Sequence, residues 1–475
     1  MKNKKTWILV FSIVLAISFM SIHSNSFWGD EACRLWNPEY TFGEHIGRAI
    51  RLGQTGYMLY VGAWGKIFGL SEVAMRCSNI PFALIAAYQV TLILKKIKLP
   101  AWFFVFFFVH PMFTYYMNEI APYLLIYALS LVFIRYVLFS DDEFNDLKNI
   151  IKINAIFLVG TFCHFIFGFI YIIYLCKCIF EIADKKLVLS RHLKVLAGFS
   201  IVYIPLFVVI LRGLLWRIQI TGTYGLQNIA FIFYGFAGFG GIGMSRNDLR
   251  AYKFENLTMA HVIGIVLLVL VYLAILFLAR KKVVGILKNN YKIWFSALGC
   301  FAFLNIVSAI ARFRVWERHS MIVFPIWILL ICFCVNEITV PKKYFISICM
   351  LVLMLYSSAN LRFNYYYYCD DFKSVQSAIK QYVEAGNIGA IYTGEKDVWG
   401  FYDLEEVIDD YGTEIIIIGE DDVATVGRKI KARDEEKVIL ILGEKFYNEN
   451  EYNFFDEEAS IVNDSYNSYK ILVFD

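Results

Sequence analysis

Residues 258–279 read TMAHVIGIVLLVLVYLAILFLA and contain no Asp, Glu, Lys or Arg. A helix of this length rises about 33 Å, which is enough to cross the roughly 30 Å hydrocarbon core of a bilayer. Other apolar runs share this character, and the full set of predicted spans is 7–22, 72–94, 99–117, 122–140, 150–164, 166–182, 195–212, 258–279, 291–311, 319–335 and 344–360. The sequence therefore predicts an α-helical polytopic membrane protein with about eleven transmembrane helices.

The composition of the whole chain agrees with this class. Hydrophobic residues make up 59% of the 475 residues and charged residues only 18%, compared with roughly 25% charged residues in soluble proteins. An ordinary soluble enzyme is thereby excluded. Most of the ten cysteines lie inside apolar runs without a C-x-x-C motif, so we interpret them as small core residues.

Charge divides the chain into two parts. Residues 370–475 carry 25 acidic and 10 basic residues, whereas residues 1–369 carry 16 acidic and 35 basic residues. We expect a membrane domain over 1–363 and an acidic soluble α/β domain over 364–475. Its predicted strands are 390–392, 415–418, 438–442 and 471–474, and its predicted helices are 372–385, 404–411 and 423–431. An acidic surface repels a phosphate backbone, so no nucleic acid partner is expected.

The distribution of basic residues predicts the orientation in the membrane. With a cytoplasmic N-terminus, 18 of the 20 lysines in 1–369 fall on the inner side, as the positive-inside rule requires. The C-terminal domain is then extracytoplasmic, and we expect a plasma membrane of bacterial type. Twelve of the 15 arginines fall on the outer side instead. They either contact lipid headgroups or surround a phosphorylated ligand, which suits the bidentate guanidinium.

Two long outer loops are predicted to be structured. The first, 23–71, contains segments with helical spacing at 40–51 and 56–68 that could lie along the membrane interface. The second, 213–257, is rich in glycine and aromatic residues, which is typical of a mobile gating loop over a pocket. A short hidden span at 228–242 is the alternative interpretation of the second loop.

The strongest local signal for chemistry is Trp28-Gly29-Asp30-Glu31, directly after the first span. A carboxylate with an ordinary pKa near 4 is ionised at neutral pH, so it can accept a proton from a hydroxyl group. Asp30 is also near enough to the bilayer to meet the head of a lipid-linked substrate. The alternative is that Asp30 caps a helix or forms a salt bridge with Arg34.

A second acidic residue, Glu119, lies in the segment from His110 to Tyr123. This segment places Glu119 in a short turn between the third and fourth spans, on the same side as Asp30. We therefore expect the two carboxylates to face one outer cavity. The alternative is that Asn118 and Glu119 only cap the helix that opens at Pro122.

An ordered set of residues across 1–375 has a recognisable pattern. Its members are Asp30-Glu31, Gly56 to Tyr60, Trp64, Phe68 to Glu72, Arg76 to Pro81, Pro111 to Tyr123, His164, Arg318-His319 before Pro325, and Asp371-Phe372. In this pattern the chain resembles the GT-C glycosyltransferases that use lipid-linked sugars. The similar branch contains the protein O-mannosyltransferases and the lipid A aminoarabinose transferases.

The resemblance implies an inverting transfer of a sugar from a polyprenyl-phosphate donor to an acceptor hydroxyl at the outer membrane face. The first acid of the pair carries the role of general base, so Asp30 takes it, with Glu31 and Glu119 as further catalytic acids. Where relatives often have Glu-x-Arg-x-Tyr, this chain has Ala121 in the arginine position. The residues expected to bind the donor and its phosphate are Arg76, Tyr123, His164, Arg312, Arg314, Arg318 and His319. A guanidinium there would stabilise the charge on the departing phosphate.

Several expectations stay open. No cofactor and no metal are expected, although Asp30, Glu31, His23 and His45 could hold a divalent cation. The acceptor is a glycan, a lipid or a protein. A surface-polysaccharide polymerase or ligase, a lipid-linked sugar transporter or flippase, and a scaffolding protein without activity are the alternative functions. Cys33 and Cys369 are predicted to lie on the same side, either as a disulfide or as two free thiols.

Overall fold

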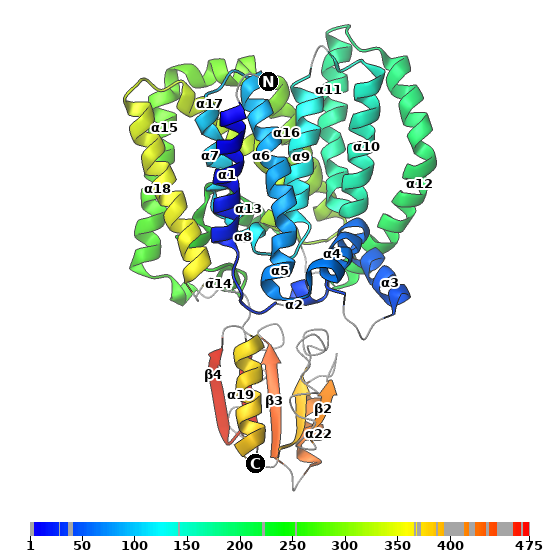
Figure 1. Ribbon diagram of the computed structural model, residues 1–475, viewed down its shortest axis with the longest axis vertical. Coiled ribbons are helices and arrows are strands. Elements are labelled where there is room, and N and C mark those ends of the chain that lie inside the picture. Colours follow the sequence, from blue (N-terminus) through cyan, green and yellow to red (C-terminus); the bar gives the residue numbers. More distant parts are fainter. Residues whose placement is uncertain are drawn as a thin grey trace. The chain divides into compact units, whose positions relative to one another are not determined.

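A computed structural model describes residues 4–27, 29–36, 41–140, 143–220, 224–251, 254–364, 367, 372–385, 388–393, 413–417, 423–433, 437–443, 459–466 and 469–474. The chain forms two compact units (Figure 1). The first comprises Met1–His23 and Phe42–Tyr367, and the second comprises Ser24–Thr41 and Tyr368–Asp475. Residues 24–41 therefore group with the C-terminal part of the chain, although they follow the first helix.

The first unit is helical throughout. Its α-helices are α1 (Lys4–Ser21), α3 (Phe42–Leu52), α4 (Thr55–Phe68), α5 (Glu72–Arg76), α6 (Ile80–Lys96), α7 (Phe104–Phe108), α8 (Pro111–Met117), α9 (Tyr123–Leu138), α10 (Leu147–Cys163), α11 (Tyr171–Ala183), α12 (Leu189–Ile220), α13 (Leu226–Ala237), α14 (Arg246–Ala251), α15 (Met259–Asn289), α16 (Tyr291–Ile310), α17 (Phe324–Asn336) and α18 (Lys342–Phe363). Short 3-10 helices are η1 (Cys77–Asn79), η2 (Ala101–Phe103), η4 (Phe165–Ile170), η5 (Phe239–Gly241), η6 (Phe254–Asn256) and η7 (Glu317–Ile322).

The polytopic helical class is confirmed, but the count of eleven spans is not. Within the described residues, six helical segments are long and apolar enough to cross a membrane: Glu72–Lys96, Phe165–Ala183, Leu189–Arg212, Met259–Asn289, Tyr291–Ile310 and Lys342–Phe363. The segments predicted to be helical in the first outer loop form α3 and α4. Their position at the membrane interface stays a prediction.

The prediction of one continuous helix over 99–117 was wrong. The segment contains η2, α7 and α8, and the backbone of His110 between α7 and α8 is extended. Pro111 is the cause, because a proline disfavours helical geometry at the preceding residue and cannot donate a backbone hydrogen bond. The His110 ring stabilises the break, since its Nδ1 accepts a hydrogen bond from the Met112 N–H at 3.2 Å.

The predicted second outer loop, 213–257, is also largely helical. α12 continues to Ile220, and α13, η5, α14 and η6 follow. α13 overlaps the hidden span considered at 228–242, but it belongs to the shorter apolar helices and not to the six candidate spans. A membrane crossing at 228–242 and a gating role for this segment both stay predictions. α13 ends at Gly238, which has a φ of 87°, a conformation that favours glycine.

The second unit contains a five-stranded sheet of order β2-β1-β3-β5-β4. The strands are β1 (Ile388–Thr393), β2 (Glu414–Ile417), β3 (Lys437–Gly443), β4 (Ile461–Tyr466) and β5 (Tyr469–Phe474). β1 pairs in parallel with β2 and β3, whereas β5 pairs antiparallel with β3 and β4. The small α/β class is confirmed, while the predicted helix at 404–411 lies outside the described residues.

Residues of the sheet alternate between two cores. Ile439 and Ile441 of β3 pack with α19 (Phe372–Ala385) on one face. Val438, Leu440 and Leu442 pack with α22 (Val423–Lys431) on the other. This alternation follows from the two-residue period of a strand. Figure 1 shows α19 lying against the sheet, with its axis along the direction of the strands.

Candidate functional site

Glu119 is buried in the turn between α8 and α9, with only 4% of its surface exposed. Asn79 at the end of η1 holds this turn, because its Nδ2 donates to the carbonyl oxygens of Tyr116, Met117 and Glu119 at 3.2, 3.2 and 2.9 Å. The last carbonyl groups of a helix have no partner within the helix. Asn79 thus satisfies the end of α8 and fixes the position of Glu119.

Asn118 connects this turn to the end of α1. Its Oδ1 accepts a hydrogen bond from the His23 N–H at 3.0 Å, and its Nδ2 donates to the Ser21 carbonyl oxygen. The N-cap of α9 is Pro122, which makes no side-chain capping hydrogen bond. The contacts of Asn118 therefore favour a tertiary connection over the helix-capping alternative.

Arg76 is buried beside the same turn and is 1% exposed. Its Nε donates to the Asn118 carbonyl oxygen at 2.8 Å, and its Nη1 donates to the His23 carbonyl oxygen at 3.0 Å. Both acceptors are backbone oxygens. These contacts favour a positioning role for Arg76 over the predicted contact with a donor phosphate.

A buried charged cluster includes two tyrosines of α8, Tyr115 and Tyr116. Arg246 of α14 forms an ion pair with Glu317 of η7, with Nη1 and Oε1 3.0 Å apart. The Tyr116 hydroxyl donates to the same Glu317 oxygen at 3.2 Å, and the Arg246 guanidinium stacks 3.5 Å from the ring centroid of Tyr115. Glu317 is fully buried, so this pairing offsets the cost of removing its charge from water.

The field of the surrounding acidic groups keeps Arg246 charged. Burial alone would lower the pKa of Arg246, but the nearby Tyr116, Glu317, Tyr115 and Glu119 groups outweigh it and raise the pKa. Glu119 thus contributes to the same electrostatic environment as the Arg246–Glu317 pair. Within the ion pair, the Glu317 carboxylate neutralises the Arg246 guanidinium.

Three of the predicted binding residues lie around a fourth, Tyr123. The ring centroid of Tyr123 lies 5.7 Å from that of His164 and 6.2 Å from that of His319. The Arg318 guanidinium lies 5.6 Å from the same ring centroid. Tyr116, 5.2 Å from Tyr123 between ring centroids, connects this group to the charged cluster.

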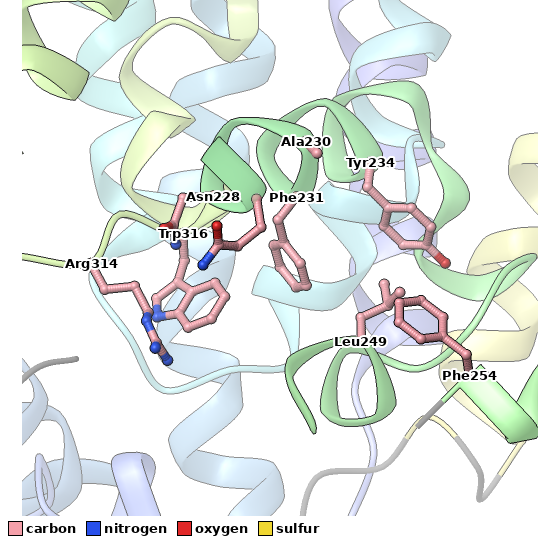
Figure 2. A pocket seen from close by; sticks show the side chains of 9 residues that line it. Asn228, Ala230, Phe231, Tyr234, Leu249, Phe254, Arg314 and Trp316 are labelled. Atoms are coloured by element: carbon pink, nitrogen blue, oxygen red, sulfur yellow. The ribbon is translucent and has the colours of Figure 1, made fainter. Parts of the chain in front are cut away.

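A cavity of about 220 Å³ opens beside η7. Figure 2 shows the side chains that line it. They are Gln227, Asn228, Ala230, Phe231, Tyr234, Leu249, Phe254, Arg314 and Trp316. The Arg314 guanidinium lies 5.1 Å from the ring centroid of Trp316, whereas Arg312 lies after the end of α16 and does not line the cavity. Most of the lining is apolar, so the cavity can accept a ligand with an apolar body and an anionic group near Arg314.

Asp30 and Glu31 lie on α2 (Gly29–Ala32) in the second unit. The Asp30 side chain is 43% exposed, and its Oδ2 lies 3.9 Å from Nη2 of Arg34. Glu31 is only 1% exposed. Asp30 is therefore the more accessible acid of the pair, and the salt bridge considered as an alternative is present at long distance. Because Glu119 belongs to the first unit, the convergence of the two carboxylates stays a prediction.

Part of the region around Asp30 lies outside the described residues. Trp28, Cys369 and Asp371 lie outside the described residues, and so does a pairing of Cys33 with Cys369. In the part of the chain that the structure describes, no group of three or more His, Cys, Asp or Glu side chains could hold a metal ion. Independence from metal stays a prediction.

No family model matches the chain, and no curated protein matches its sequence. Two crystal structures of ArnT from Cupriavidus metallidurans are similar to it, one in the apo state and one bound to undecaprenyl phosphate. Each has a TM-score of 0.54 and covers 99% of this chain and 98% of ArnT, at 9% and 8% identity respectively. The chain has the fold of ArnT. ArnT is a lipid A aminoarabinose transferase of the GT-C class, so the resemblance is confirmed at the level of the fold.

The sequence did not predict the roles of Glu317 and Asn79 or the pairing of Arg246. In the sequence, Arg246 is only one of many outer arginines, and Glu317 is only a neighbour of Arg318. One signal was present, because Glu317 is an acid next to the apolar run of α17. An acid in that position needs a cationic or hydrogen-bonding partner.

Proposed function

We propose that the chain is an integral membrane glycosyltransferase that moves a sugar from a polyprenyl-phosphate donor to an acceptor hydroxyl at the outer membrane face. The observation that carries this proposal is the fold shared with ArnT over 99% of the chain. The ArnT structure that holds undecaprenyl phosphate supports the donor class. The protein would reside in a bacterial plasma membrane, with a cytoplasmic N-terminus and an extracytoplasmic C-terminal domain.

In the proposed reaction, Asp30 accepts the proton of the acceptor hydroxyl as its oxygen attacks the anomeric carbon. The bond between that carbon and the phosphate oxygen breaks, and polyprenyl phosphate departs from the opposite face, which inverts the configuration. The exposure of the Asp30 carboxylate supports its role as the base. The burial of Glu31 supports a positioning role for that acid.

Arg314 and Arg318 are the proposed contacts of the departing phosphate. Arg314 lines the apolar cavity, and Arg318 faces the ring of Tyr123. Negative charge grows on the phosphate oxygen in the transition state, so a positioned guanidinium lowers the barrier. Arg246 is a weaker candidate because Glu317 already neutralises it. Glu119 is proposed to orient the donor or the acceptor.

The proposal is tested by incubating the purified protein with a panel of polyprenyl-phosphate sugars and a mixture of acceptor glycans, lipids and peptides. We expect stoichiometric release of polyprenyl phosphate and a product with inverted anomeric configuration by NMR. Consumption of lipid diphosphate donors alone would favour the polymerase or ligase. Movement of intact lipid-linked sugar across vesicles without release would favour the flippase. Neither release nor movement would favour a scaffolding role.

A further inference from the structure

The segment that carries Asp30 belongs to the second unit, together with the C-terminal domain. α1 ends at Ser21 and α3 begins at Phe42, and both helices are in the first unit. The residues between them, Ser24–Thr41, group instead with the C-terminal residues from Tyr368 onward. The segment between α1 and α3 therefore contributes α2 to a domain whose other residues follow more than 300 positions later in the sequence.

Two contacts attach this segment to α19. Ala32 is 3% exposed and packs in the same core cluster as Phe372 and Val375. The Ser26 hydroxyl oxygen accepts a hydrogen bond from the Lys373 N–H at 3.0 Å. That N–H lies in the first turn of α19, where backbone donors have no partner within the helix. Ser26 thus caps α19 from a distant part of the sequence.

The geometry of α2 depends on this attachment. A helix of four residues is not stable alone, because nucleation costs more than its few hydrogen bonds return. Residues two positions apart lie on nearly opposite sides of a helix. When Ala32 enters the core, Asp30 is consequently directed away from it, which agrees with the 43% exposure of the Asp30 side chain.

We propose that the C-terminal domain is a positioning part of the active site: through Ser26 and Ala32 it fixes the orientation of α2 and so of the Asp30 carboxylate. This inference rests on the proposed glycosyltransferase function. In this proposal Ser26 and Ala32 position the Asp30 carboxylate and do not themselves contact the substrate. The soluble domain is then required for the chemical step even if it binds neither donor nor acceptor.

The test compares full-length wild type with Ser26→Ala, Ser26→Thr and Ser24→Ala in lipid nanodiscs. Ser24 is an exposed serine in the same segment, so Ser24→Ala is a matched control. Hydrogen–deuterium exchange is measured for residues 24–36 and for β3 and β5. Losing one hydrogen bond of about 1 kcal/mol should accelerate exchange in 24–36 roughly fivefold in Ser26→Ala. Ser26→Thr and Ser24→Ala should exchange as wild type does.

Kinetics with a polyprenyl-phosphate sugar supply the second readout. Misplacement of the base should lower kcat about tenfold in Ser26→Ala and leave KM within about twofold. Ser26→Thr should restore the wild-type kcat.

Unchanged exchange in 24–36, or faster exchange with unchanged kcat, would overturn the proposal. Faster exchange in β3 and β5 as well would mean that Ser26→Ala disturbs the whole sheet. Ala32→Gly is then tested in its place, and it must give faster exchange in 24–36 together with a lower kcat. If exchange in 24–36 is faster in Ser26→Ala but the wild-type protein releases no polyprenyl phosphate, the attachment of α2 through Ser26 is supported and the proposed glycosyltransferase function is refuted.

Discussion

Arg246 and Glu317 form a buried ion pair whose two members depend on each other. Changing Arg246 to Met removes the cation and leaves the Glu317 carboxylate buried with Tyr116 as its hydrogen-bond donor. We expect a loss of roughly 3–5 kcal/mol in the free energy of unfolding. Denaturant titration of the protein in detergent measures it.

The double variant Arg246→Met with Glu317→Gln is the control for that prediction. Removing both charges avoids an unpaired buried carboxylate, so the double variant should be more stable than Arg246→Met alone. A double variant as unstable as the sum of the two single changes would show that the pair is not coupled.

His23 makes stability depend on pH. Burial first, and then the charges of Arg76 and Arg362, lower the pKa of His23 to about 2. The unfolded chain binds a proton below the ordinary pKa of about 6.5, whereas the folded chain does not. This contribution to stability is therefore complete above pH 6.5 and is lost as the pH falls from there toward 2.

Between pH 7 and pH 5.5 we expect His23 to account for about 1 kcal/mol of lost stability. His23→Gln should reduce the pH dependence by that amount, because glutamine does not titrate. Unfolding midpoints in detergent at the two pH values measure the difference. Identical pH dependence in wild type and His23→Gln would contradict the assigned burial of the neutral ring.

The sequence predicted which residues lie near one another in the candidate site better than it predicted what each of them contacts. Tyr123, His164, Arg318 and His319 were expected from the resemblance, and the structure brings them together. Arg76 was expected at a phosphate, and two of its hydrogen bonds go to backbone carbonyl oxygens. Its contact with a phosphate stays a prediction. The sequence cannot distinguish these uses, because a guanidinium donates equally well to a phosphate and to a carbonyl oxygen.

At the scale of elements, the turn between α3 and α4 depends on Gly53. Its φ is 63°, and an added Cβ would lie 2.8 Å from Cδ1 of Phe165. The Phe165 N–H also donates to the Gly53 carbonyl oxygen at 3.0 Å. This contact connects the turn between α3 and α4 to the residue that follows His164, so the turn helps to place the predicted donor site.

Gly53→Ala should therefore lower the free energy of unfolding by roughly 2–4 kcal/mol in total, because it adds both backbone strain and steric overlap. Gly238→Ala is the matched control, because Gly238 also has a left-handed backbone with φ 87°, but the atom nearest to its added Cβ would lie at an ordinary contact distance of 3.5 Å. It should cost only the strain, about 1–2 kcal/mol. Thermal unfolding in detergent compares the two. Equal losses would show that Phe165 yields and that the contact does not hold the turn.

Elements were predictable where one local pattern decides them. The helix at 372–385 coincides with α19, and the strands around 390–392 and 438–442 were confirmed. β4 was missed for two reasons. Among the described strands it pairs with β5 alone, at the edge of the sheet, and its Asn463, Asp464 and Ser465 are residues typical of turns. An edge strand needs less apolar sequence, so its pattern is weak.

At the scale of the whole molecule, charge and hydropathy by themselves separate a basic helical part from an acidic α/β part. The membership of Ser24–Thr41 in the second unit was not predictable. It depends on Ala32 and Ser26 meeting α19, which is a contact between residues far apart in sequence. A local periodicity carries no information about such a contact.

Asp30 is the proposed base of a transfer from a polyprenyl-phosphate sugar. The most direct test of this role is the rate of polyprenyl phosphate release by wild type, Asp30→Asn and Glu44→Gln, the last being an acid-to-amide control at an exposed residue in the same outer loop. Losing a positioned base should lower the rate roughly a hundredfold or more in Asp30→Asn, with Glu44→Gln equal to wild type. Equal release by wild type and Asp30→Asn would contradict the account.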